Sequence, residues 1–197
     1  MNDQTRMQRR RRFAVIAISA ITACTTAACS KNTGIEATNS TAPVAKVLTL
    51  GQPSPPQEVT KNGKFTIAPT KVVEGKPDDL KELHDSKFDG QKIVWIYVRA
   101  KNVGGTVVKD PATMKGVGAE TTLGSPATSF ILIADLSTMP KDCKRFDAAE
   151  NLESTDIWKK GEERTVCEPY LIPANTKVNY VTYAQGYYDE PLKWSVK

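Results

Sequence analysis

The chain has 197 residues and a mass of 21.6 kDa, with 40% apolar and 25% charged side chains, which is the composition of an ordinary globular protein. A single histidine argues against a histidine-rich metal site and against most histidine-dependent catalysis. The formal net charge is +5, but residues 1–23 hold five arginines against Asp3 and carry +4 of it. The remaining chain is nearly neutral and has no basic excess to neutralise the phosphates of a nucleic acid, which disfavours nucleic-acid binding.

The first 23 residues have the pattern of an export signal. Arg9–Arg12 form a charged segment, and Phe13–Ile21 follow as a short apolar segment. This apolar run is shorter than the roughly 20 residues of a membrane-spanning helix. Arg10–Phe13 also resembles a twin-arginine export sequence, but four consecutive arginines match it easily by chance, which favours a generic positive segment. The pattern predicts a signal peptide over residues 1–23 and an exported protein.

Two cysteines lie at the end of this leader. Residues 21–24 (ITAC) resemble the bacterial lipobox, which implies cleavage before Cys24 and a diacylglycerol group on its thiol. Residues 26–29 (TAAC) are a second match, with cleavage between residues 28 and 29 and lipid on Cys29. The sequence pattern favours Cys24, whereas cysteine parity favours Cys29, because Cys143 and Cys167 then remain as a pair. Either choice predicts a lipid anchor in the membrane, and a freely secreted product is the alternative.

Residues 24–60 are rich in Ser, Thr, Asn, Ala and Pro. The prolines of Gln52–Gln57 fix φ and disfavour helix in the residues before them. We therefore predict a disordered tether over residues 24–60, followed by one folded domain over residues 61–197. Val47–Leu50 is a weak candidate for a short edge strand within the tether.

The domain carries strand patterns and no long helical periodicity. Its short apolar runs are separated by Gly and Pro turns, a spacing typical of an antiparallel β-sandwich, with a small barrel as the alternative. Asp78–Asp85 and Asp147–Trp158 are candidates for single helical turns. Two of the strands, before and after Pro173–Asn175, form a predicted hairpin. The predicted strands are Phe65–Ala68 with a continuation at Lys71–Val73, Ile93–Lys101, Thr106–Val108, Ser129–Ala134 (buried), Arg164–Ile172, Lys177–Ala184 and Leu192–Val196.

The strand Ile93–Lys101 has the strongest pattern. Its even-numbered residues from Val94 to Ala100 are all apolar and must face the core, because successive side chains point to opposite faces. The opposite face is apolar from Ile93 to Tyr97 and turns polar at Arg99 and Lys101. We therefore predict that this strand is central at one end and exposed at the other.

Cys143 and Cys167 lie on either side of a polar stretch. In an exported protein such a pair predicts a disulfide. Closing a loop of this length stabilises the fold by roughly 3 kcal/mol in the chain-entropy model. The disulfide would attach the charged segment Lys141–Lys160 to the strand at Thr165–Glu168. Metal binding by the two cysteines is disfavoured, because no nearby His or Cys completes a set of four ligands.

The domain combines an apolar strand running into Lys101–Gly104, a buried strand after it, and Gly161 followed by residues 167–173 (CEPYLIP). In this combination it resembles the telokin-like, immunoglobulin-like domains of secreted actinobacterial proteins. Many of these proteins are lipoproteins whose domain has no known function. The resemblance covers about residues 61–197 and implies an all-β, immunoglobulin-like antiparallel β-sandwich with an extracellular location. The excursion over residues 136–160 departs from the family pattern. The family brings no catalytic residues to this chain.

Patterns for catalysis are missing from the sequence. It has no nucleophile elbow, no phosphate-binding loop and no His-Glu-x-x-His zinc sequence. His84 lies in a charged run, where a solvated side chain is expected rather than a general base. Asp85–Gly90 begins like a calcium loop, but Ile96 stands where that loop needs a carboxylate. We therefore expect no enzyme activity, no catalytic residue, no metal site and no cofactor.

Tyr187 and Tyr188 are the candidate partner contacts. They lie in a loop near the C-terminus, where exposed tyrosines stack on sugar rings or contact a protein partner; structural tyrosines are the alternative. The sequence as a whole predicts a lipid-anchored protein on the extracellular face of the cell membrane. Its expected role is non-catalytic, as a binding or adaptor protein. The expected partner is a cell-surface protein or a wall glycan, and no nucleic-acid partner is expected. A small-molecule or ion capture protein is the alternative, followed by a secreted hydrolase.

Overall fold

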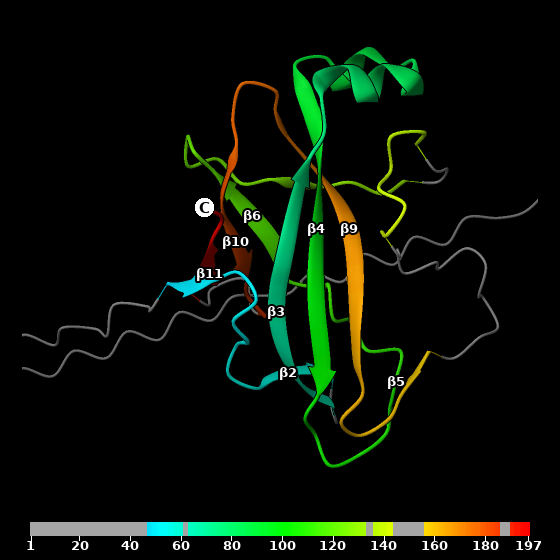
Figure 1. The fold of residues 1–197 in the computed structure, drawn as a ribbon, viewed down its shortest axis with the longest axis vertical. Coiled ribbons are helices and arrows are strands. Elements are labelled where there is room, and N and C mark those ends of the chain that lie inside the picture. The colour runs from blue at the N-terminus through cyan, green and yellow to red at the C-terminus, as the bar shows by residue number, and fades with distance from the viewer. Residues whose placement is uncertain (1–46, 61–62, 133–135, 144–155, 186–189) are drawn as a thin grey trace, which may run out of the picture. The chain divides into compact units, whose positions relative to one another are not determined.

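A computed structural model describes residues 47–60, 63–132, 136–143, 156–185 and 190–197 (Figure 1). These residues form strands and turns, with two short 3-10 helices, η1 and η2. The elements in chain order are β1 (Leu48–Thr49), β2 (Gln57–Thr60), β3 (Gly63–Glu74), η1 (Pro77–Leu83), η2 (Ser86–Phe88), β4 (Gln91–Asn102), β5 (Val108–Lys109), β6 (Val117–Thr121), β7 (Thr128–Ser129), β8 (Ile157–Trp158), β9 (Glu163–Pro173), β10 (Val178–Tyr183) and β11 (Leu192–Ser195).

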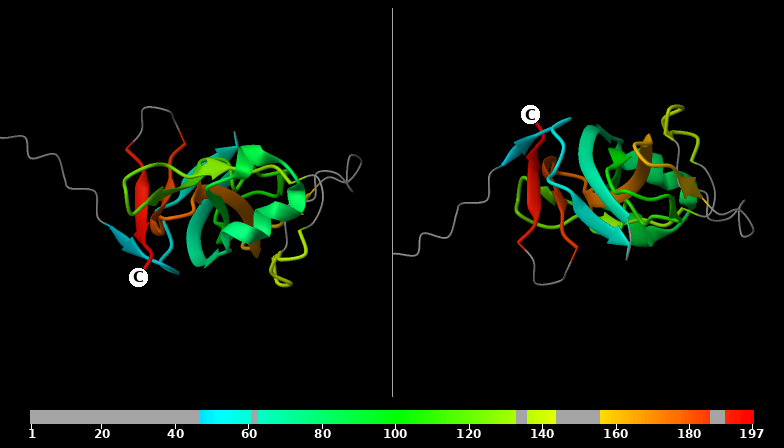
Figure 2. Two further views of the ribbon diagram at one scale, coloured as in Figure 1. Left: turned by 90° about the horizontal axis from the view of Figure 1, so that it is seen from above. Right: turned by 90° about the horizontal axis from the view of Figure 1, so that it is seen from below.

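The strands form two sheets and one separate ribbon. The larger sheet has the order β2-β3-β4-β9-β7 and the smaller sheet the order β1-β11-β10-β6. All neighbours are antiparallel except β1, which is parallel to β11. Among the described strands, β5 and β8 pair only with each other. Side chains of both sheets meet in one buried cluster between them, and Figure 2 shows the sheets end-on. This arrangement confirms the predicted immunoglobulin-like antiparallel β-sandwich.

Strand β4 is the centre of the larger sheet and confirms the predicted division of its faces. It pairs with β3 on one side and with β9 on the other. Its even-numbered residues from Val94 to Ala100 are fully buried between the sheets. Residues Ile93 to Tyr97 on the opposite face are buried in a second apolar cluster, whereas Arg99 is half-exposed and Lys101 exposed. The predicted continuation of β3 past Pro69 is also present, with a register shift between Pro69 and Lys71.

The folded domain begins before residue 61, so the predicted tether over residues 24–60 is too long. Leu48 is buried and pairs with Trp194, which confirms the short strand predicted at Val47–Leu50. The Trp194 indole N–H donates to the carbonyl of Gln52 at 2.8 Å, and the Ile67 amide donates to Ser54 Oγ at 3.0 Å. These bonds hold the proline-rich segment against the domain, which composition alone did not indicate. Residues 24–46 lie outside the described residues.

The predicted hairpin around Pro173–Asn175 is wrong. Both strands exist, but β9 belongs to the larger sheet and β10 to the smaller one, so the turn crosses between sheets. Tyr170 and Ile172 of β9 and Val181 of β10 are buried in the same inter-sheet cluster, on its two sides. Two consecutive strands show the same alternation of apolar and polar residues whether they pair in one hairpin or lie in two facing sheets, because each strand buries one face in both cases. The sequence pattern therefore cannot distinguish the two arrangements.

The predicted buried strand Ser129–Ala134 is also wrong. Of its described residues, 129–132, only Ser129 is strand, as the end of β7 (Thr128–Ser129), and Ile131 is 86% exposed; residues 133 and 134 lie outside the described residues. Phe130 and Leu132 pack on the second cluster while the chain runs across the sheet as an irregular segment. Similarly, the strand predicted at Thr106–Val108 is displaced to Val108–Lys109.

The helical turn predicted at Asp78–Asp85 is confirmed as η1. The one predicted at Asp147–Trp158 lies mostly outside the described residues, and its last two residues are strand β8. Strand β6 was not predicted. Within the part of the chain that the structure describes, no helix is long and apolar enough to cross a membrane.

Candidate binding surface

The outer face of the larger sheet is covered by irregular chain and fixed by a disulfide. Trp95, on β4, lies in an apolar cluster with Leu80 of η1 and Leu136. Cys143 and Cys167 are bonded, with their Cα atoms 5.2 Å apart, which confirms the predicted disulfide. Because Cys167 belongs to β9, the bond attaches the end of the covering segment directly to the sheet.

A polar contact lies beside this disulfide. The Tyr97 hydroxyl donates to Asp142 Oδ1 at 2.7 Å, and Lys71 Nζ lies 2.8 Å from Asp142 Oδ2 and 4.5 Å from the centre of the Tyr97 ring. Lys71, followed by Tyr97, lowers the pKa of Asp142 below its ordinary value. Burial, helped by the Asp142 charge, raises the pKa of Tyr97. These groups satisfy one another and hold the covering segment, which is a structural role.

A shallow pocket of about 330 Å³ lies along η1 and η2, within Pro77–Gly90. Its charges pair with one another: Lys81 Nζ lies 2.9 Å from Asp78 and Lys87 Nζ 2.7 Å from Asp85. The hydrogen bonds from these lysines lower the pKa of each aspartate. His84 lines the pocket and is solvent-exposed, as predicted. The pocket is open and is lined by apolar as well as charged side chains, so it suits a small, weakly held solute.

The opposite end of β4 leads into a rigid turn over residues 102–107. The Asn102 side chain is fully buried, and its amide donates to the carbonyls of Thr106 at 3.0 Å and Lys159 at 3.2 Å. Its Oδ1 accepts the Gly104 amide at 3.1 Å. One side chain therefore joins the turn to the segment after β8, which fixes both at the lower end of Figure 1.

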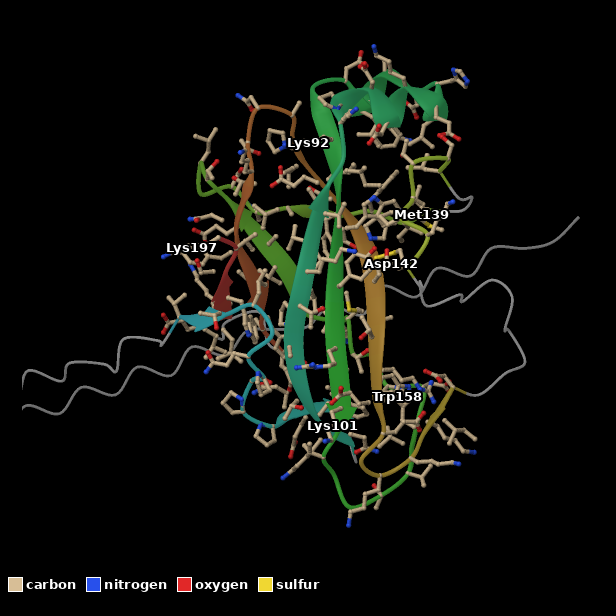
Figure 3. All side chains as sticks on the ribbon, in the orientation of Figure 1. Lys92, Lys101, Met139, Asp142, Trp158 and Lys197 are labelled. Carbon is tan, nitrogen blue, oxygen red and sulfur yellow. A yellow bond between two sulfur atoms is a disulfide. The ribbon has the colours of Figure 1, made fainter. Side chains whose placement is uncertain are left out.

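The ribbon β5·β8 is attached to the sandwich through Trp158. Its indole is buried, packs edge-on against Phe65 at 5.4 Å, and donates to Asp156 at 2.7 Å. Arg164 lies over the same ring at 4.6 Å and bonds both Asp156 and Glu162. A hydrogen bond from the Lys159 amide, followed by the Arg164 guanidinium, lowers the pKa of Glu162. The labelled Trp158 in Figure 3 marks this cluster.

The ribbon's outer side combines aliphatic and cationic side chains. Lys109 pairs with Ile157 in the register, so their side chains share one side of the ribbon. Val107 is 58% exposed and Ile157 43%, whereas Val108 and Trp158 point inward. Val103, in the adjoining turn, is 42% exposed. We call Val103, Val107, Lys109, Ile157 and Lys159 the valine–lysine face.

The lysines of this face are free while the neighbouring carboxylates are engaged. Among the described residues, Lys109 Nζ and Lys159 Nζ have no ion-pair partner. In contrast, Asp156 and Glu162 bond Arg164, and the backbone of Asp156 donates to Asp110 Oδ1 at 2.7 Å. The face therefore presents two exposed lysines that have no ion-pair partner among the described residues, beside exposed aliphatic groups.

The other predicted site residues are not tested by the structure. Cys24, Cys29, Tyr187 and Tyr188 all lie outside the described residues. Across the described ranges no group of three or more His, Cys, Asp or Glu side chains is placed to hold a metal ion. The valine–lysine face was not predicted, because its residues are ordinary strand residues in the sequence and only the pairing of β5 with β8 separates their two sides.

No family model matches the chain, and no characterised protein matches its sequence at a significant level. Among solved structures, the chain is similar to MPT63, a secreted protein from Mycobacterium tuberculosis whose crystal structure was determined at 1.5 Å resolution. The two share 11% sequence identity with a TM-score of 0.47, over 79% of this chain and 100% of that one. This likeness is too weak to carry any argument about function.

Proposed function

We propose that this chain is an extracellular lipoprotein, anchored to the outer face of the cell membrane through Cys24 or Cys29, with a non-catalytic binding or adaptor role at the cell surface. The observation that carries the binding role is the valine–lysine face. It is exposed, is joined to the sandwich through Asn102 and Trp158, and carries two lysines that have no ion-pair partner among the described residues.

Two independent features support the extracellular location. The leader has the charged and apolar segments of an export signal. The Cys143–Cys167 disulfide persists in an oxidising compartment and is uncommon in a reducing one. The immunoglobulin-like sandwich agrees with the expected relation to secreted actinobacterial lipoproteins, which stays part of this proposal.

The absence of catalysis is also a proposal, supported by how the charged groups are used. Asp142, Asp156 and Glu162 each bond a cation of the same domain. Carboxylates fixed in this way hold structure and are poorly placed to bind a reacting group.

A capture protein for a small molecule or ion is the second candidate. It is favoured by the open pocket along η1 and η2, where His84 and Asp89 are exposed. Such a protein binds its solute at Pro77–Gly90 and leaves the valine–lysine face unused.

The test is photo-crosslinking on live cells, with a photoreactive side chain at residue 107 and a control at Leu123, which is 72% exposed in a different loop. We expect one recurrent surface component attached at residue 107 and not at residue 123. Robust hydrolysis by the purified protein, abolished by a single Asp or Glu substitution, would overturn the non-catalytic role. The intact mass of the mature protein tests the lipid anchor separately.

A further inference from the structure

We propose that the valine–lysine face binds the anionic lipid surface of the membrane in which the protein is anchored. This inference rests on the proposed function and names the partner of the same surface. It commits to lipid headgroups and the acyl boundary beneath them, rather than to a protein or a glycan.

The types of residue on this face favour lipid. Lysine is depleted in protein–protein interfaces, and valine is uncommon among residues that dominate their binding energy. Stacking on a sugar ring needs an exposed aromatic side chain, but the aromatic residue of the ribbon, Trp158, points inward and is buried. Aliphatic side chains surrounded by lysines are instead the combination that contacts membranes, because the aliphatic groups enter the acyl boundary while lysines attract anionic lipids.

The construction of the face suits shallow insertion. Lys109 and Ile157 lie opposite each other on one side of the ribbon, and Val107 and Lys159, which directly flank its two strands, are exposed beside them. The Asn102 hydrogen bonds and the Trp158 packing hold this end in place before any contact. Because few side chains must be ordered on binding, the loss of conformational entropy reduces the binding free energy only slightly.

Anchoring and docking are geometrically compatible. Residues 24–46 span at most about 80 Å when extended, so the chain between the lipidated cysteine and β1 is long enough for contact at this end of the domain. A single lipid group and a basic patch are the two kinds of signal that together hold a protein firmly on a membrane. Strand β4 is 12 residues long, about 40 Å, so docking at its Asn102 end directs η1 and its pocket away from the membrane.

The inference is tested with tryptophan as a depth probe in the full mature chain. The native tryptophans Trp95, Trp158 and Trp194 are at most 2% exposed and give a constant background. We would compare Val107→Trp with Leu123→Trp, after reconstitution into vesicles that contain brominated phospholipid. Leu123 is a matched control because it lies at the other end of the domain, near η1. It follows Thr121, which pairs with Val178, and the Val178 amide donates to Glu74 at the end of β3 that leads into η1.

We expect quenching of Val107→Trp fluorescence in phosphatidylglycerol vesicles, little quenching in phosphatidylcholine vesicles, and none of Leu123→Trp in either. Adding Lys109→Gln with Lys159→Gln should lower the ratio of docked to undocked protein about 30-fold, since each lysine contributes about fivefold at an anionic surface. Lys177→Gln with Lys197→Gln, two exposed lysines elsewhere, should change it little. Raising the salt concentration should weaken docking as well.

Equal quenching at residues 107 and 123, or no quenching in anionic vesicles, overturns the inference. Crosslinking of residue 107 to a protein or glycan, without quenching, overturns it while leaving the binding role intact. If the mature protein has no lipid, the anchor fails, but the same variants mixed with preformed vesicles still test the face. All substitutions are at exposed positions, and unchanged emission of the three buried tryptophans reports that the fold is retained.

Discussion

The two faces of β4 bury equally apolar side chains by different means. Ile96 points into the sandwich and Ile93 points outward, and both are fully buried. Ile96 is enclosed by strands of two sheets, whose positions follow from a long hydrogen-bonded register. Ile93 is enclosed by η1 and by residues 130–132 and 136–143, the last of which are attached by the disulfide and by the Tyr97–Asp142 contact. Equal burial therefore does not mean equal rigidity.

The largest expected effect comes from shortening these two isoleucines. We expect Ile96→Ala to cost about 4 kcal/mol and Ile93→Ala about 2 kcal/mol, because the cost of a cavity depends on how far its walls relax. The irregular cover over Ile93 can move inward, whereas paired strands around Ile96 cannot without losing their register. Urea denaturation of both variants measures the difference. Equal losses would show that the two covers are equally rigid and would break the comparison.

Removing the disulfide should act on the outer face alone. Cys143→Ala with Cys167→Ala is expected to cost roughly 3 kcal/mol. Combined with Ile93→Ala the losses should be non-additive, because both changes loosen one cluster, whereas with Ile96→Ala they should add within about 0.5 kcal/mol. Double-mutant cycles by denaturation test this. A coupling with Ile96→Ala as large as that with Ile93→Ala would contradict the independence of the two faces.

A smaller effect is expected from Tyr97→Phe, which removes the hydroxyl that donates to Asp142. The loss should be about 1 kcal/mol at pH 7, the typical contribution of one hydrogen bond. Tyr180→Phe is the control, since the Tyr180 hydroxyl has no hydrogen-bond partner among the described residues.

The Tyr97 effect should also depend on pH. Burial raises the pKa of Tyr97 in the folded protein, so only the unfolded chain ionises as the pH passes the ordinary tyrosine value of about 10. Ionisation of the unfolded chain lowers the stability of the native protein, and the Tyr97→Phe variant lacks this loss. Its disadvantage relative to the native protein should therefore shrink above pH 10, and a growing disadvantage would contradict the assignment.

The inner face could be predicted from sequence and the cover of the outer face could not. Alternation from Ile93 to Ala100 shows that both sides of β4 are apolar, because it depends only on neighbouring residues. What covers the outer side depends on contacts between distant segments. Phe130 and Leu132 therefore resemble strand residues, although their backbone leaves the sheet. The Cys143–Cys167 pair was predictable because its chemistry, rather than its register, identifies it.

The valine–lysine face was hidden from sequence for the same reason. Val107 and Val108 are identical in type and adjacent, yet one is 58% and the other 5% exposed. Only the register of Lys109 with Ile157 decides which of them points outward. By contrast, Tyr187 and Tyr188 are predicted from residue type alone, and they lie outside the described residues.

The smallest expected effect sharpens the comparison at a polar residue of the inner face. Glu168 pairs with Ile96 and so points between the sheets, where burial raises its pKa. No described side chain or amide bonds its carboxylate.

Because the pKa of Glu168 is raised in the folded protein, the free energy of unfolding falls as the pH rises from the ordinary glutamate pKa to the raised pKa, and it stays lower at higher pH. Glu168→Gln should therefore stabilise the protein at pH 7 and change little at about pH 3.5, where glutamate is protonated in both states. Glu163→Gln, exposed on the same strand, is the control and should stay within about 0.5 kcal/mol at both pH values. Denaturation at the two pH values measures the effect, and a loss of stability at pH 7 would mean that Glu168 has an ionic partner in the native protein and that the inner face, like the outer one, depends on polar contacts.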